Sequence, residues 1–79
     1  MKLEAAIYQV VNSTKVISRP YMLKDRHCYL VYQGLNLPFK LHNTITKLRI
    51  DWHPSVDELW ADDWFAELPE LLDPPRDED

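Results

Sequence analysis

Glycine and cysteine are almost absent from this chain of 79 residues, and each scarcity excludes a class of site. With Gly34 as its only glycine, the chain cannot form a glycine-rich phosphate-binding loop. With Cys28 as its only cysteine, it has no intrachain disulfide, which fits a reducing cytoplasm. No apolar run approaches the roughly 20 residues of a membrane-spanning helix, so we expect no membrane insertion.

The net charge of −4 comes entirely from the C-terminal end. Residues 1–68 hold eight basic and eight acidic side chains, whereas residues 69–79 hold five acidic side chains and Arg76. The end also holds three prolines, Pro69, Pro74 and Pro75. We therefore predict one domain over residues 1–68 and an acidic, proline-rich tail over residues 69–79 that is largely disordered from about Asp73. A single core is only just sufficient at this length, so self-association is also expected.

The hydrophobic pattern predicts a small α+β domain on an antiparallel sheet. Apolar residues at helical spacing from Leu3 to Val11 predict an amphipathic N-terminal helix. Alternation and β-forming residues predict strands at 15–19, 27–33, 44–50 and 64–68, with an edge or interrupted strand at 35–41. A loop or turn is expected at 21–26.

All three tryptophans lie between Trp52 and Trp64, around a short helix signal. Ser55, followed three residues later by Glu58, is the pattern of a capping box and predicts a helix at 55–61. The apolar residues at three- and four-residue spacing predict one buried stripe, formed by Val56, Leu59 and Trp60. The acidic residues are expected to face water, namely Asp57, Glu58, Asp62 and Asp63.

Four segments occur in the same order as in a known family. They are Glu4-Ala5-Ala6, Lys15 to Tyr21, Tyr29-Leu30-Val31, and Trp52-His53-Pro54-Ser55 with Asp57 to Trp64. They resemble the small phage and prophage family that includes the second type of Thoeris anti-defence protein, over residues 3–68. The chain differs from the family's pattern at three places, and at one of them, the region around Leu35–Asn43, the family has no clear counterpart. Asn12-Ser13-Thr14 replaces the usual glycine of the helix-to-strand turn, and Tyr21 aligns with the first tryptophan.

The resemblance implies a non-enzymatic homo-oligomer in the host cytoplasm, without a cofactor. Such a protein sequesters a cyclic nucleotide immune signal, for example glycocyclic ADP-ribose or a cyclic oligonucleotide, in pockets between subunits. The family has also been associated with an anti-CRISPR activity, so the target of this chain stays open.

A cyclic nucleotide offers flat bases, phosphates and hydroxyls, and the chain holds a side chain for each. Aromatic rings can stack on bases, and the candidates are Tyr21, Trp52 and Trp64. Cationic side chains can pair with phosphate, and the candidates are Arg19, Lys24 and Arg26. We predict a ligand site of Arg19, Tyr21, Trp52 and Asp63, in which Asp63 accepts from a hydroxyl or amine. The structural alternative places Trp60 and Trp64 in the core and leaves Arg19 as an exposed strand residue.

The residues do not predict an enzyme. The three histidines and Cys28 lack the spacing of a zinc ligand pair, and neighbours on a strand point to opposite faces. We therefore predict no catalytic residue and no metal site.

Two other classes of function remain open beside the signal-binding protein. One is an acidic inhibitor or adaptor that mimics nucleic acid or docks on a basic surface of a host defence protein. The other is an accessory protein whose aromatic patch is only a subunit interface. Direct nucleic-acid binding is not expected for any of them.

Overall fold

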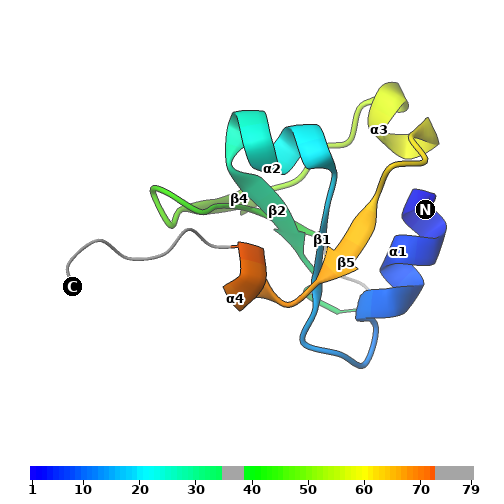
Figure 1. Ribbon diagram of the computed structural model, residues 1–79, viewed down its shortest axis with the longest axis horizontal. Helices are drawn as coiled ribbons and strands as arrows, with labels where there is room; N and C mark the ends of the chain where they lie inside the picture. Colours follow the sequence, from blue (N-terminus) through cyan, green and yellow to red (C-terminus); the bar gives the residue numbers. More distant parts are fainter. Residues whose placement is uncertain (35–38, 73–79) are drawn as a thin grey trace.

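The computed structural model describes residues 1–34 and 39–72 (Figure 1). The elements in chain order are α1 (Leu3–Val10), β1 (Val16–Ser18), α2 (Pro20–Arg26), β2 (Cys28–Val31), β3 (Lys40–Asn43), β4 (Arg49–Asp51), α3 (Val56–Trp60), β5 (Phe65–Glu67) and α4 (Pro69–Leu72). The strands form one antiparallel sheet in the order β4-β3-β2-β1-β5. The predicted α+β fold on an antiparallel sheet is therefore confirmed.

One face of the sheet carries an apolar row across all five strands. The register pairs Ala66 with Ile17, Ile17 with Leu30, Leu30 with Leu41, and Leu41 with Ile50. Directly opposite residues in an antiparallel sheet share a face, so these five side chains lie on the same side. Ile17 and Leu30 are fully buried at the centre of the row, whereas Ile50 at the β4 end is 61% exposed.

The core lies between this face and the helices. Leu3, Ala6 and Val10 from α1 pack with Ile17 and Leu30, and Met22 from α2 with Trp64 completes the cluster. Helix α1 contacts β1 and β5, and α2 contacts β2, so the helical layer lies over only part of the sheet (Figure 1). The β3–β4 side extends beyond it.

Several predicted elements are confirmed. The N-terminal helix and the strands expected at 15–19, 27–33 and 64–68 are present as α1, β1, β2 and β5, each shorter than the predicted segment. The capping box is formed in full, because the Ser55 hydroxyl accepts from the Glu58 N–H at 3.2 Å and the Glu58 carboxylate accepts from the Ser55 N–H at 2.9 Å.

The prediction of a loop at 21–26 is wrong, because these residues belong to helix α2. Pro20 occupies the first helical turn, where its missing N–H has no cost, and Lys24 and Arg26 lie in the last turn, where cations favour the helix dipole. His27 ends the helix in the left-handed conformation, with φ of 56°. The burial of Met22 in the core adds tertiary stabilisation to a short helix.

The single strand expected at 44–50 is also wrong, because its first half is the turn of a β-hairpin. The Asn43 side-chain oxygen accepts hydrogen bonds from the N–H groups of Ile45 and Thr46, at 2.8 and 2.9 Å, and Lys47 has φ of 65°. An asparagine that bonds to the backbone in this way favours a turn over a strand. The possible strand at 35–41 is present only as the start of β3 at Lys40, and residues 35–38 lie outside the described ranges.

The buried stripe expected on α3 is reversed. Val56, Leu59 and Trp60 are 68%, 51% and 76% exposed, whereas Glu58 is buried. The capping box explains the reversal, since it holds the Glu58 carboxylate against the backbone at the start of the helix. A helix of five residues then has its apolar side chains on its outer face.

The segment predicted as a tail begins with helix α4, and Pro69 is again at a helix start, where proline is tolerated. The disorder predicted from Asp73 concerns residues outside the described ranges. Within residues 1–34 and 39–72, the longest helix has eight residues, and no helix has the length and apolar content needed to cross a membrane.

Candidate functional site

A groove lies between α2 and the β3–β4 hairpin, where the helical layer ends. Its larger part has a volume of about 380 Å³ and is lined by Arg26, Cys28, Leu41, Asn43, Leu48 and Ile50. Its smaller part has a volume of about 200 Å³. Arg26, Leu41 and Ile50 line both parts, which we therefore treat as one site and name the hairpin groove. The smaller part continues along Met22, Asp51, Trp52, His53 and Glu58.

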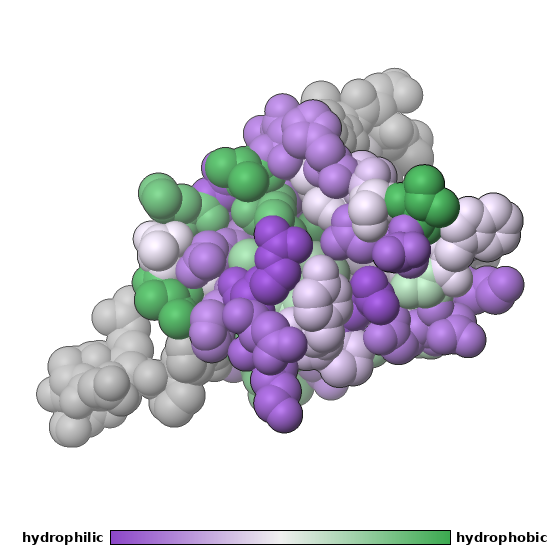
Figure 2. All heavy atoms as spheres, turned by 90° about the horizontal axis from the view of Figure 1, so that it is seen from above, coloured by the Kyte–Doolittle hydropathy of each residue, from purple (hydrophilic) through white to green (hydrophobic). Residues whose placement is uncertain are grey.

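The floor of the hairpin groove is the uncovered end of the apolar row on the sheet. Leu41 and Ile50 are register partners on β3 and β4, and Leu48 lies on the same face as Ile50. Leu48 and Ile50 are 69% and 61% exposed, although they belong to the face that forms the core elsewhere. Figure 2 shows hydrophobic side chains exposed at the end of the molecule where the hairpin lies. The groove thus offers an apolar surface to a ligand.

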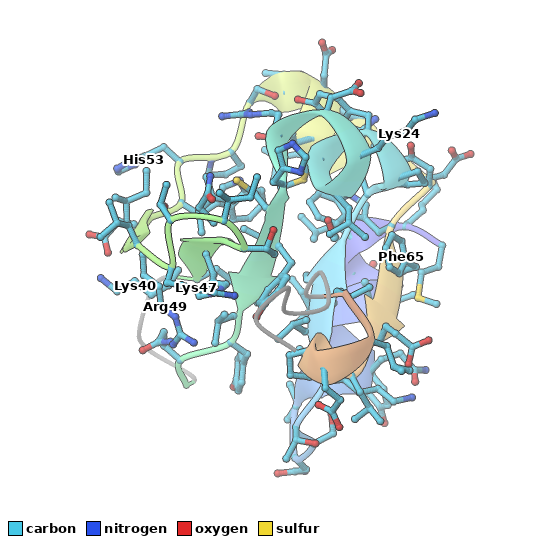
Figure 3. All side chains as sticks on the ribbon, turned by 60° about the vertical axis from the view of Figure 1, so that its left-hand side comes forward. Lys24, Lys40, Lys47, Arg49, His53 and Phe65 are labelled. Carbon is cyan, nitrogen blue, oxygen red and sulfur yellow. The ribbon has the colours of Figure 1, made fainter. Side chains whose placement is uncertain are left out.

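Arg26 borders this apolar floor, and Lys40 and Arg49 lie on the other face of the hairpin. Arg26 lines both parts of the groove and is charged like every arginine, and a hydrogen bond with Tyr21 raises its pKa further. Figure 3 shows Lys40, Lys47, Arg49 and His53 gathered around the hairpin. Lys40 forms an ion pair with Asp51, and Arg49 Nε donates to His42 Nδ1 at 3.0 Å. Arg26 is therefore the cationic side chain that an anionic ligand in the groove would meet.

Cys28 lines the groove as a protonated thiol. Its Sγ donates a hydrogen bond to the Arg26 carbonyl oxygen at 3.0 Å, and burial raises its pKa above the ordinary value for cysteine. Since the thiolate is the nucleophilic form, this environment does not activate Cys28 for covalent chemistry.

Three of the four predicted ligand residues meet in one cluster outside the groove. Arg19 binds the Asp63 carboxylate through both Nε and Nη2, at 2.6 and 3.4 Å, and its Cζ lies 5.1 Å from the centre of the Tyr21 ring. The hydrogen bond from Arg19 lowers the pKa of Asp63 below its ordinary value. The charges of Arg19 and Asp63 therefore satisfy each other, and a ligand would have to compete with this ion pair.

Trp52, the fourth predicted residue, lies apart from that cluster and lines the hairpin groove. It is half-buried between Phe39 and Trp64, with edge-to-face contacts at centroid distances of 6.1 and 5.8 Å. Trp64 itself is 1% exposed and donates from Nε1 to the Glu58 carbonyl at 2.9 Å, as the structural alternative expected. Trp60 is instead exposed, so the same alternative is wrong for that residue.

The sequence-based site missed the floor of the groove. The sequence predicts Leu41, Leu48 and Ile50 on strands and gives them no role in binding, although the imperfect alternation at 44–50 is a signal that some apolar residues face outward. Arg26 was considered only as one of three phosphate partners. In the structure, Arg26 lines both parts of the groove.

No family model matches the chain, and no curated protein or solved structure is significantly similar to it. The part of the chain that the structure describes contains no group of three or more histidine, cysteine, aspartate or glutamate side chains placed to hold a metal ion. The fold and the groove therefore define an α+β protein with an open cleft that has an apolar floor and one arginine, Arg26, and the function is inferred from that cleft.

Proposed function

We propose that this protein binds a cyclic nucleotide immune signal in the hairpin groove and sequesters it without degrading it, as a phage anti-defence protein in the host cytoplasm. The observation that carries the proposal is the combination in one cleft of an apolar floor, the Trp52 indole and the Arg26 guanidinium. These are the surfaces that a base and a phosphate require.

The two parts of the groove suit the two parts of a nucleotide. The smaller part is lined by Trp52 and would accept a base, since stacking on an aromatic ring contributes about 1–3 kcal/mol per base. The larger part at Leu41, Leu48 and Ile50 would cover the apolar surface of the ligand. Arg26 stands where the two parts join and would pair with phosphate. The basic side chains around the hairpin would raise the rate at which an anion arrives.

Binding without turnover is supported by the state of the one thiol in the groove. The raised pKa of Cys28 keeps it protonated, and its hydrogen is committed to the Arg26 carbonyl. We therefore propose that the bound signal leaves the protein chemically unchanged.

The ligand residues that we now propose are Arg26 and Trp52. The Arg19–Asp63 ion pair and the Tyr21 ring would act as support, because Tyr21 contacts Arg19 and is hydrogen-bonded with Arg26. Direct contact of Arg19, Tyr21 or Asp63 with a ligand remains a prediction from the sequence.

A thermal-shift screen against cyclic dinucleotides, cyclic trinucleotides and cyclic ADP-ribose isomers tests this proposal. A ligand at 100 times its dissociation constant should stabilise the protein by about 2.7 kcal/mol. Denaturing the complex should release the ligand with its mass and chromatographic retention unchanged. A screen without any shift, or a recovered ligand that has been cleaved, would refute the proposal.

Two arginine variants locate the site. Arg26→Gln removes the charge from the groove and should weaken binding about tenfold to hundredfold, since hydrogen bonds to charged groups contribute about 1.5–3 kcal/mol. Arg19→Gln removes the same charge from the ion pair with Asp63 and should change affinity much less. Equal losses for the two variants would place the ligand outside the hairpin groove.

One observation favours a second candidate, the protein-binding inhibitor. Trp60 is 76% exposed beside Leu59 and Val56 on the outer face of α3, and exposed tryptophans are enriched at the centres of protein interfaces. Asp57 and Asp62 flank this face with negative charge. If this candidate is correct, Trp60→Ala or removal of residues 73–79 abolishes anti-defence activity, whereas both changes leave a signal-binding protein nearly intact.

A further inference from the structure

The β4 strand is an edge of the sheet and carries both apolar and charged side chains. Among residues 1–34 and 39–72, it pairs with β3 alone (Figure 1). An exposed edge strand offers unpaired backbone groups to another chain. Ile45, Leu48 and Ile50, all at least 60% exposed, lie in or beside this strand. The edge therefore has both the backbone groups and the apolar surface of an interface.

The backbone N–H and C=O groups of Arg49 and Asp51 point toward the open edge of β4, as the hydrogen bonds of their neighbours show. Asn43 N–H donates to the Leu48 carbonyl and Trp52 N–H donates to the Phe39 carbonyl, each at 3.0 Å, so Leu48 and Trp52 turn their polar groups toward β3. In an antiparallel ladder this direction alternates along the strand. Ile50 therefore also faces β3, and the N–H and C=O groups of Arg49 and Asp51 face outward.

The sequence Arg49-Ile50-Asp51 is self-complementary in charge when two copies pair antiparallel. With Ile50 opposite Ile50 of the second copy on a two-fold axis, Arg49 of each copy lies opposite Asp51 of the other. This register also matches the outward backbone groups, because Arg49 and Asp51 become the hydrogen-bonded pair and Ile50 the non-hydrogen-bonded pair. Opposite charges at directly paired positions stabilise a sheet.

The other registers are unfavourable. A two-fold axis at Arg49 or at Asp51 places like charges opposite each other. A shift by one residue turns the apolar face of one copy against the charged face of the other. Only the register centred on Ile50 keeps the two apolar faces on one side and matches the charges.

We propose that a second copy of this chain pairs with the first through β4, antiparallel and centred on Ile50. On one face, the floors of the two hairpin grooves meet along Leu41, Ile50 and their symmetry mates. On the other face, Asp51 lies between Lys40 of its own chain and Arg49 of the second copy. The interface is isologous and closes after two subunits. This proposal is based on the edge of the sheet and does not depend on the proposed ligand.

Charge reversal tests the pairing without a ligand. The wild-type chain of 9.4 kDa should sediment as a dimer at high concentration, over a series from ~1 µM to ~1 mM. Arg49→Glu turns two pairs from opposite to like charge and should raise the dissociation constant ~10- to ~100-fold. Lys24→Glu makes the same charge change on the exposed surface of α2 and should leave the dimer unchanged.

Mixing two variants tests the register. Arg49→Glu and Asp51→Lys should each be monomeric alone, whereas their equimolar mixture should form a heterodimer, because every paired position then carries opposite charges. Circular dichroism checks that both variants fold, since Asp51→Lys also removes the ion pair with Lys40. If Asp51→Lys unfolds, the dissociation constant of the Arg49→Glu dimer alone tests the proposal. A wild-type monomer at all concentrations, a dimer indifferent to Arg49→Glu, or a mixture of folded variants without heterodimer would overturn the proposal.

Discussion

The replacement of Trp64 by phenylalanine should destabilise the protein strongly, although it keeps an aromatic ring. Trp64 is 1% exposed, and its Nε1–H donates to the Glu58 carbonyl at 2.9 Å. Without this donor, the buried acceptor loses its partner at a cost of about 1–3 kcal/mol. The smaller ring also removes apolar volume, which adds about 1 kcal/mol if one methylene equivalent of about 0.8 kcal/mol is lost.

The expected loss for Trp64→Phe is therefore about 2–4 kcal/mol in the free energy of unfolding. In a domain of this size, 1 kcal/mol corresponds to about 4–8 °C in the melting temperature, so a decrease of at least about 8 °C is expected. Urea denaturation followed by circular dichroism gives the free energy, and a thermal scan gives the melting temperature.

The matched control is Trp60→Phe, the same substitution four residues earlier. Trp60 is 76% exposed, so its replacement should change stability by less than about 0.5 kcal/mol. Equal effects of the two substitutions, or a larger effect at Trp60, would show that Trp64 is not the centre of the core and would refute the packing described for α3.

Two further predictions concern the polar contacts. Asn43→Ala removes the acceptor of two turn hydrogen bonds and should cost about 1–2 kcal/mol in urea denaturation, and a loss below about 0.5 kcal/mol would show that the hairpin turn does not depend on Asn43. Because Arg19 lowers the pKa of Asp63 in the folded state, this ion pair adds stability above the unfolded pKa of aspartate, and the stability is lost as pH falls through the lower folded pKa. Asp63→Asn should therefore reduce the loss of stability on acidification below about pH 4, and an unchanged acid titration would contradict the pair's contribution.

The sequence predicted the elements whose signals are local. The capping box at Ser55 and Glu58 specifies the start of α3 by two side chains that bond to nearby backbone groups. The strand at Cys28–Val31 lies in a run of β-forming residues, where the sequence predicts it. Such signals do not depend on the rest of the fold.

The elements that were missed depend on contacts distant in sequence. Helix α2 has no side-chain cap at Arg19, and Met22 packs in a core formed by α1 and the sheet. The hairpin turn contains Thr44 and Thr46, which favour strands, and is decided by the Asn43 side chain and the left-handed Lys47. Neither set of contacts is visible in local alternation.

The candidate site stays a prediction, but the structure shows where its residues lie. Trp52 follows β4 and lines the hairpin groove. Arg19, Tyr21 and Asp63 come together as predicted, but 44 residues separate Arg19 from Asp63, and the sequence did not show that they bind each other. The groove floor has only the imperfect alternation at 44–50 as a local signal, since it exists because the helical layer stops short of β3 and β4.

The edge-to-face series Phe39, Trp52 and Trp64 has an optical consequence. Indole rings with centroids 5.8 Å apart exchange excitation energy efficiently, so Trp52 and Trp64 form one emitting pair that spans the groove wall and the core. Trp60, alone in solvent, contributes the red-shifted background of a water-exposed indole. A Trp60→Phe chain would therefore carry an intrinsic fluorophore whose blue-shifted emission reports the polarity of the hairpin groove, with no attached dye.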